Sequence, residues 1–317
     1  MVAVIGSLNI DLVTYVTRLP RLGETLIGKR FKESLGGKGA NQAVAIAKLG
    51  VPVNMLGCIG YDERGLALLN SLAANGVNVK YVTRILDAPT GVALIQVDSR
   101  GDNTIIVIPA ANEMLSIELV KRSKKAIEEA SVVVAQMEVP VETVKYAFEV
   151  AKNLGKITIL NPAPADMFID NLISNTDILV PNEIELETIS GKSITKYDDV
   201  LIAAQILFDK GIRDLIVTLG ERGCIHFNRN GTKVYDGRRV TAVDTTAAGD
   251  SFVGTLAAML SEGKGIDEAI TYAVAASALT VTKEGAQIAL PYRMEVENYL
   301  EDESIQKLEM RNNPRCF

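Results

Sequence analysis

Apolar residues occur along the chain in short runs separated by longer amphipathic stretches, which predicts strands alternating with helices. The first run, Val2–Ile5, reads as a buried strand that ends at Gly6 and Ser7. From about residue 113 the alternation becomes regular. We predict the helices Ile117–Glu129, Val141–Leu154, Val200–Lys210, Gly249–Ser261 and Ile266–Thr282, and the strands Ser131–Gln136, Ile157–Leu160, Asp177–Val180, Leu215–Leu219 and Cys224–Phe227. This rhythm is typical of an α/β fold with helices on both faces of a mostly parallel sheet.

Two stretches interrupt the alternation, because each holds two β-prone runs with no helix between them. The first pairs Leu12–Thr17 with Thr25–Glu33, and the second pairs Thr90–Val97 with Asn103–Pro109. We expect them to form a small β lid, although an edge extension of the main sheet fits the periodicity equally well. The predicted division is a core of residues 1–11, 35–89 and 110–300, a lid of residues 12–34 and 90–109, and a peripheral tail of residues 301–317.

Composition narrows the class of protein. The chain has 317 residues, 48% hydrophobic and 23% charged, which is typical of a globular protein with a sizeable core. A net charge of −6 and the lack of basic runs argue against nucleic-acid binding. Three scattered cysteines and one histidine, His226, argue against disulfides, a zinc site and a histidine-based triad. With no targeting segment or membrane-length apolar run, the sequence predicts a cytoplasmic protein with no membrane contact.

The segment Val243–Phe252 combines small residues with two acidic side chains just before a long helix. Gly249 at the helix start would let backbone N–H groups approach an anionic ligand closely. Asp250 would lie beside that anion, where a carboxylate could take a proton from an attacking hydroxyl group. Asp250 could equally be a helix cap, and the segment alone does not separate the two roles.

A second candidate is the glycine-rich segment Leu35–Ala45, in which Lys38 and Asn41 precede or open a helix. Its spacing is not that of a dinucleotide-binding fingerprint, and an isolated loop of this kind is more often a turn than a site. The sequence Gly191-Lys192-Ser193 resembles the end of a phosphate-binding P-loop. It lacks the required earlier glycine, because Leu186 stands there.

Further polar residues follow predicted strands. Glu138 follows one strand, Asn161 ends another, and Asn182 and Glu185 follow a third, while Thr218–Gly223 closes a fourth with a glycine turn. Each alone is more often structural than functional. Because parallel strands end at one edge of a sheet, we expect a common rim that carries Asn9, Asp11, Glu138, Asn182, Gly220 and Asp250.

Together these residues resemble the ribokinase family of carbohydrate and nucleoside kinases. The resemblance runs over nearly the whole chain, from Val4–Asp11 to Lys283–Gln287, and both family signatures, Gly36–Ala45 and Asp244–Phe252, are present in order. It implies a Rossmann-like α/β/α sandwich with a small β lid. It also implies phosphoryl transfer from ATP to a sugar hydroxyl, with Mg²⁺ bound alongside the nucleotide.

The resemblance also implies roles for particular residues. Asp250 would be the catalytic base, beside an anion hole formed by the N–H groups of Ala247, Ala248 and Gly249. The sugar would be held by Asn9, Asp11, Gly37, Lys38, Gly39, Ala40, Asn41, Glu138 and Asp250. Nucleotide and Mg²⁺ would be bound by Asn182, Glu185, Thr218, Leu219, Gly220, Glu221, Arg222, Gly223, Gly249 and Val274. A monovalent cation, usually K⁺, would be held by Asp244, Thr246, Thr280, Lys283, Gly285 and Ala289.

Two positions depart from the family pattern. Val274 stands where His or Asn is frequent near the adenine, and Ala110 replaces a frequent glycine before Ala111 and Asn112. We expect phosphorylation of D-ribose at its 5-hydroxyl by a homodimer paired through the lids. The alternatives are a kinase for deoxyribose, fructose, a keto-deoxy sugar acid or a nucleoside, or a sugar- or nucleotide-binding regulator without catalysis.

Overall fold

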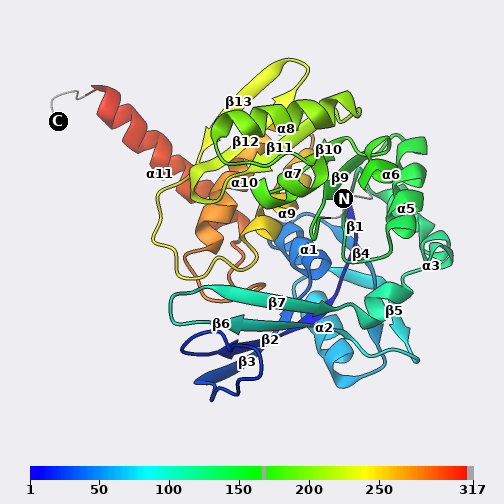
Figure 1. Cartoon of the computed structure of the whole chain (residues 1–317). Coiled ribbons are helices and arrows are strands. Elements are labelled where there is room, and N and C mark those ends of the chain that lie inside the picture. Colours follow the sequence, from blue (N-terminus) through cyan, green and yellow to red (C-terminus); the bar gives the residue numbers. More distant parts are fainter. Residues whose placement is uncertain (166–168, 313–317) are drawn as a thin grey trace.

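The computed structural model describes residues 1–165 and 169–312, and within them nine strands form one large sheet (Figure 1). Seven strands are parallel and two antiparallel strands close one edge. In spatial order they are β13 (Gly231–Asp236), β12 (Gly223–Asn228), β11 (Asp214–Thr218), β10 (Ile178–Leu179), β9 (Ile157–Asn161), β8 (Val132–Gln136), β1 (Val2–Ile5), β4 (Val53–Gly60) and β5 (Asn78–Ile85). The predicted α/β class is confirmed.

Helices cover both faces of this sheet, and each face has its own hydrophobic core. Val2 and Val4 belong to one core, whereas Ala3 and Ile5 belong to the other, as the alternation of side chains along a strand requires. The first core packs under α1 (Lys38–Lys48), α2 (Glu63–Ala74), α9 (Ala248–Ser261) and α10 (Ile266–Thr280). The second packs under α3 (Ile117–Arg122), α4 (Lys124–Glu129), α5 (Val141–Asn153), α6 (Asp170–Ile173), α7 (Glu183–Ser190) and α8 (Tyr197–Asp209).

The two helix-free stretches form a second, four-stranded sheet, which lies below the main body in Figure 1. Its order is β3 (Arg30–Gly36), β2 (Asn9–Tyr15), β6 (Gly91–Val97) and β7 (Asn103–Ile108). Both predicted ribbons are antiparallel, and a parallel pairing of β2 with β6 joins them. We call this unit the smaller sheet.

The predicted bounds of the smaller sheet are wrong in its first ribbon. β2 begins at Asn9 rather than Leu12, so Asn9 and Asp11 lie in a strand and not in a loop after β1. β3 begins at Arg30, and residues 25–29 are not strand. The register accounts for both errors. Asn9 pairs with Gly36, so polar positions that interrupt the apolar run still form ladder pairs. The ladder ends where Tyr15 pairs with Arg30, so β3 begins at Arg30.

Other differences are local. The predicted helix Ile117–Glu129 is broken at Ser123 into α3 and α4. β4, β5 and α2 are missing from the predicted set. The predicted tail overlaps α11 (Arg293–Asn312), which projects away from the body in Figure 1, while residues 313–317 lie outside the described residues. Among the described helices, none combines the length and the apolar character needed to span a bilayer.

The strand order places a switch point at β1. The chain adds β4 and β5 on one side of β1 and then returns to add β8, β9, β10 and β11 on the other. The connections after β1 and β8 therefore diverge at their carboxyl ends, and ligands of open α/β sheets bind in such a crevice.

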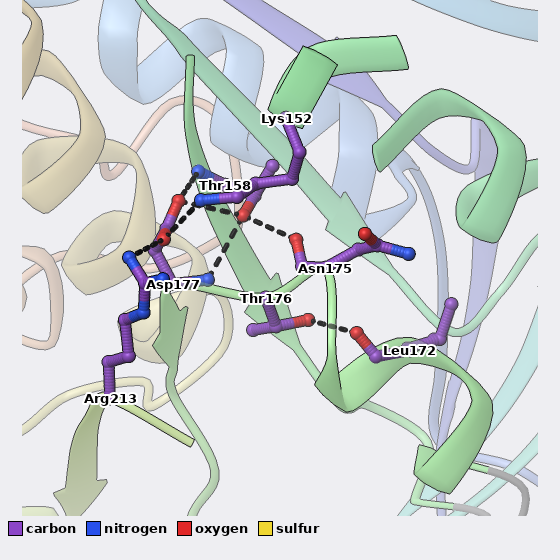
Figure 2. A network of polar contacts seen from close by, with 7 residues as sticks. All are labelled: Lys152, Thr158, Leu172, Asn175, Thr176, Asp177 and Arg213. Carbon is purple, nitrogen blue, oxygen red and sulfur yellow. Dashed lines mark hydrogen bonds and ion pairs between the residues drawn. The ribbon is translucent and has the colours of Figure 1, made fainter. Parts of the chain in front are cut away.

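A polar network holds the opposite end of the strands (Figure 2). The Asp177 carboxylate accepts from Lys152 Nζ at 2.5 Å and from the Thr158 backbone N–H at 3.0 Å, and Arg213 Nη1 lies 3.5 Å away. These contacts tie the end of α5 and the start of β9 to the segments before β10 and β11. Their place at the amino ends of the strands indicates a structural role, away from the crevice.

Candidate active site

Two cavities meet at the carboxyl ends of the central strands. The smaller, of about 210 Å³, lies between the ends of β9, β10 and β11 and the start of α9. The larger, of about 940 Å³, lies between that helix start and one face of the smaller sheet. Both are lined by Lys38, Ala163, Glu185, Thr245, Ala247 and Asp250. A ligand in one cavity can therefore reach a ligand in the other at Asp250.

The amino end of α9 forms the wall of the smaller cavity. Its N-cap, Ala247, has a positive φ of 62° and supplies no side-chain acceptor for the first-turn N–H groups. The Ala248 N–H donates to the Thr245 carbonyl oxygen at 3.3 Å, whereas the Gly249 N–H has no acceptor among the described residues. The helix dipole adds positive potential at this end. A Cβ built on Gly249 would meet no atom of the described residues within 4 Å, so among them the glycine faces open space in the cavity. This geometry favours a phosphate group.

Asp250 is buried where the two cavities join. Its Oδ2 accepts from Asn41 Nδ2 at 2.9 Å, and its Oδ1 accepts from Gln42 Nε2 at 3.0 Å. The cap position belongs to Ala247, so the helix-cap reading of Asp250 is wrong. Burial raises the pKa of Asp250, while Lys38 and the two amide donors lower it. A buried carboxylate of raised pKa is suited to accepting a proton.

Lys38 lies at the start of α1, surrounded by carboxylates. Burial lowers its pKa, but the charges of Asp250, Glu138, Glu185 and Asp11 outweigh this, and the net direction is upward. Lys38 therefore carries a firm positive charge beside both cavities. A cation in this place would offset the charge of a phosphate that approaches Asp250.

The larger cavity carries a connected set of polar groups at its floor. Glu138 Oε2 accepts from Ser7 Oγ at 2.5 Å and from Asn9 Nδ2 at 3.3 Å. Asn112 Nδ2 donates to Asn9 Oδ1 at 2.8 Å, and Asn112 also binds the backbone of Leu8. Pre-positioned amide and carboxylate groups of this kind bind the hydroxyl groups of a small polar molecule.

Close backbone approach explains the glycine-rich segment before α1. Gly37 has a φ of +91°, and a Cβ there would lie 2.6 Å from the Asn9 N atom and 2.8 Å from the Ser7 carbonyl oxygen. A Cβ on Gly39 would lie 2.7 Å from the Ser7 N atom. The segment follows β3 rather than a buried strand, as predicted. Its glycines let α1 pack directly on the chain that carries Asn9.

Asp11 makes the free energy of unfolding depend on pH. Burial, and then the charges of Glu138 and Asp250, raise its pKa to about 7. Because the unfolded chain has a pKa near 3.9, the folded state binds the extra proton between about pH 4 and 7, and stability falls as pH rises through this range. We predict that Asp11→Asn removes this loss. In urea unfolding, the difference in free energy of unfolding between the variant and the parent should shift in favour of the variant by on the order of 2–3 kcal/mol from pH 5 to pH 8. An equal difference at both pH values would contradict the prediction.

Asn182 and Glu185 form a capping box at the start of α7. Asn182 Oδ1 accepts from the Glu185 N–H, and Glu185 Oε2 accepts from the Asn182 N–H, each at 2.8 Å. A structural role is therefore present. Both residues also line the smaller cavity, and burial raises the pKa of Glu185. The pair can serve the helix and a ligand together.

Only part of the predicted site lines the two cavities. Besides the residues already named, Asp244, Thr246 and Gly285 line the larger and Thr218 and Ala248 the smaller. Gly285 N–H donates to Asp244 Oδ2 at 2.9 Å. The remaining predicted site residues line neither cavity: Gly39, Ala40, Leu219, Gly220, Glu221, Arg222, Gly223, Val274, Thr280, Lys283 and Ala289. Gly220 begins a 3₁₀ turn just after the carboxyl end of β11, and its place among the site residues stays a prediction.

Several site residues escape sequence reasoning. Ser7 and Asn112 hold the floor of the larger cavity, and Gln42 contacts Asp250. On the smaller sheet, Arg30 and Lys32 also line the larger cavity, and each lies 3.1 Å from Glu284 Oε1. For Gln42 the sequence offers one signal, because this residue follows Asn41 in the glycine-rich segment Leu35–Ala45. The Glu284 contact spans about 250 positions and leaves no local trace.

Known proteins resemble the chain over nearly its full length. A model of the pfkB family of carbohydrate kinases matches residues 1–293. The ribokinase of Haemophilus influenzae is 39% identical over 298 residues, which cover 94% of this chain and 97% of the relative. The deoxyribokinase of Salmonella typhi is 39% identical over 300 residues, covering 94% and 98%. The structure of Arabidopsis thaliana ribokinase with ribose and ATP has a TM-score of 0.86 and 31% identity, covering 94% of this chain and 98% of that one. The chain belongs to the pfkB family of carbohydrate kinases.

Proposed function

We propose that this carbohydrate kinase transfers the γ-phosphate of ATP to the 5-hydroxyl of D-ribose. The observation that carries the proposal is the meeting of two different cavities at Asp250. One has the amino end of α9 as its wall and suits phosphate; the other has Asn9, Asp11 and Glu138 and suits sugar hydroxyls. The relative from A. thaliana, solved with ribose and ATP, supports the same pairing of ligands.

In the proposed reaction, Asp250 accepts the proton of the 5-hydroxyl as the hydroxyl oxygen attacks the γ-phosphorus. The bond from the γ-phosphorus to the bridging oxygen of ADP breaks, and ADP leaves. The N–H groups at Ala248 and Gly249 donate to the phosphoryl oxygens on which charge develops, and Lys38 offsets that charge. Mg²⁺, bound with the nucleotide near Asn182 and Glu185, would neutralise phosphate charge. Phosphoryl transfer needs positioning and electrostatics more than covalent chemistry, and these residues supply both.

We also propose that a monovalent cation binds beside the start of α9. The six positions implied by the family resemblance include the Asp244 carboxylate, which the Gly285 N–H contacts at 2.9 Å. Oxygen donors of this kind suit a hard cation. Other members, such as Thr280 and Ala289, are buried and would contribute backbone oxygens. The cation would order the segments on both sides of the predicted anion hole.

A substrate panel tests the reaction and the cation together. We expect ADP release from Mg·ATP to depend on ribose and to rise when K⁺ is added. The panel includes deoxyribose, because one relative at 39% identity is a deoxyribokinase, together with fructose, a keto-deoxy sugar acid and nucleosides. Turnover with another panel member would change the substrate and keep the mechanism. Silence across the panel in folded protein would favour a non-catalytic regulator.

We propose that the chain divides into a core and a lid, and that the smaller sheet is the lid. Its exposed apolar side chains suggest how two copies associate. Phe31 and Ile106 are 62% and 64% exposed, and Ile105, the residue before Ile106 in β7, is 54% exposed. Neighbouring residues of a strand face opposite sides, and Ile105 lines the larger cavity, so Ile106 exposes a large apolar group on the face turned away from that cavity. We predict a homodimer through paired lids, visible by light scattering at working concentration. A monomer there would remove this part of the proposal.

A further inference from the structure

Behind Asp250 lies a chain of buried side-chain amides that comes from three different elements. Gln42 of α1 donates through Nε2 to Asp250 Oδ1 at 3.0 Å and to Asn161 Oδ1 at 3.2 Å. Its Oε1 accepts from Gln136 Nε2, at the end of β8, at 2.6 Å. Gln42 and Gln136 are fully buried and Asn161 nearly so. The carboxylate of Asp250 is thus backed by a network rather than by a single residue.

The direction of this network is fixed at one end by the backbone. Asn161 Nδ2 donates to the Val180 carbonyl oxygen at 3.0 Å, and a carbonyl oxygen can only accept. The Asn161 oxygen must therefore face Gln42, and Gln42 must donate to it through its side-chain N–H group. The Gln42 oxygen then faces the Gln136 donor. A reversed Gln42 amide would set its oxygen against both Asn161 Oδ1 and Asp250 Oδ1.

The network is kept although it leaves one group unpaired. Gln136 Oε1 is buried and has no hydrogen-bond partner among the described residues. A buried unsatisfied acceptor costs stability, and in native proteins such groups call for a reason. An apolar side chain at position 136 would avoid that cost. It would also lose the donor that orients Gln42, which is the reason we assign.

The carboxylate of an aspartate needs such support because rotation about its last torsion is soft. Asn41 holds Oδ2 and Gln42 holds Oδ1, so the two amides together fix the carboxylate plane. With either one alone, the group could turn about the remaining hydrogen bond. A general base must present a lone pair to the hydroxyl at about 3 Å, and small misplacement lowers the rate strongly.

We propose that Gln42 is a positioning residue for Asp250, held in turn by Gln136 and Asn161. Gln42 lines neither cavity, and it acts by fixing the plane of the carboxylate that accepts the proton. This inference rests on the proposed role of Asp250 as the base. It goes beyond that role, because it assigns the function of three buried amides that the reaction itself does not require.

The test compares Gln42→Met, close in size but without a donor, with the parent enzyme. We expect kcat to fall about 10–100-fold, the usual range for residues that orient a reacting group, while the KM values for ribose and ATP stay within about threefold. The acidic limb of the kcat profile should also move to higher pH, because the lost donor raises the pKa of Asp250. The charged groups that face Asp250, namely Lys38, Asp11, Glu138 and Glu185, are unchanged by the substitution.

A double-mutant cycle with Asp250→Asn separates positioning from general loss of structure. If Gln42 acts through Asp250, Gln42→Met should lower kcat far less once Asp250 is replaced. The matched control is Asn54→Leu. Asn54 is an equally buried amide on β4, bonded to Ala126 and Asn78, and outside both cavity linings. It should reduce stability and leave kcat of the folded enzyme unchanged.

The possible outcomes are distinct. Wild-type kcat in folded Gln42→Met, with Asp250→Asn inactive, would overturn the positioning role and leave the proposed function intact. High turnover in Asp250→Asn would instead overturn the proposed function. If Gln42→Met does not fold, Gln136→Met removes the support one bond further out. It should lower kcat in the same direction by less, and an unchanged kcat there would also count against the proposal.

Discussion

Replacement of Asp250 by Asn is expected to lower kcat by about 10²–10⁴-fold, the usual contribution of a general base. The introduced amide has the same shape as the carboxylate but cannot take a proton from the attacking hydroxyl. The KM for ribose should change little, because Asn9, Asp11 and Glu138 remain in the larger cavity. The measurement is ADP release under saturating ribose and Mg·ATP, with kcat and KM determined separately.

The fold of this variant should remain intact, since the side chain keeps its volume. One of the two amide donors, from Asn41 or Gln42, would then face another N–H group, which opposes stability. Burial raises the pKa of Asp250, which means that its charged form is unfavourable there, so the loss of this charge favours stability. A circular dichroism spectrum and an unfolding curve close to those of the parent would exclude misfolding. Near-parental kcat in the folded variant would remove Asp250 from the base assignment.

Much of the main sheet is predictable because its strands are buried on both faces. Every residue of β8, Val132–Gln136, is buried, so the strand reads as a continuous run. β4 is equally buried, but Asn54 and two glycines interrupt its apolar run and hide it. In β2 the polar side chains of Asn9 and Asp11 conceal the start of the strand. Long-range pairing, which the local pattern does not contain, sets these boundaries.

The candidate site divides in the same way. Asp250, Gly249 and Ala247 occur together in one segment whose residue types predict a helix start, and α9 does begin there, at Ala248, while anion binding at that end stays a prediction. The partners of Asp250 could not, because Gln42 lies 208 positions away. Ser7 and Glu138 are likewise joined across 131 positions. Sequence reasoning finds residues that carry their chemistry in a motif, whereas the side chains that orient them become visible only when the chain is folded.

The second large effect is expected from Gly249→Ala, which should separate activity from stability. In the first turn of α9 this glycine has an ordinary helical backbone, and in the part of the chain that the structure describes an added Cβ would meet no atom within 4 Å. Alanine favours a helix over glycine by up to about 1 kcal/mol, so the free energy of unfolding should not fall. The methyl group would instead occupy the smaller cavity, where the phosphoryl group is proposed to approach the backbone.

We expect kcat to fall by about 10²–10³-fold, which is comparable to the loss of one donor from an oxyanion hole. Gly37→Ala is the informative contrast, because its Cβ would lie 2.6 Å from backbone and the residue has a positive φ. That variant should lose stability by roughly 2–4 kcal/mol. Urea unfolding and kcat measured on both variants distinguish the two glycines. Parental kcat in Gly249→Ala would mean that phosphate does not approach the helix closely, and the transferring group would then have to be stabilised mainly by Lys38.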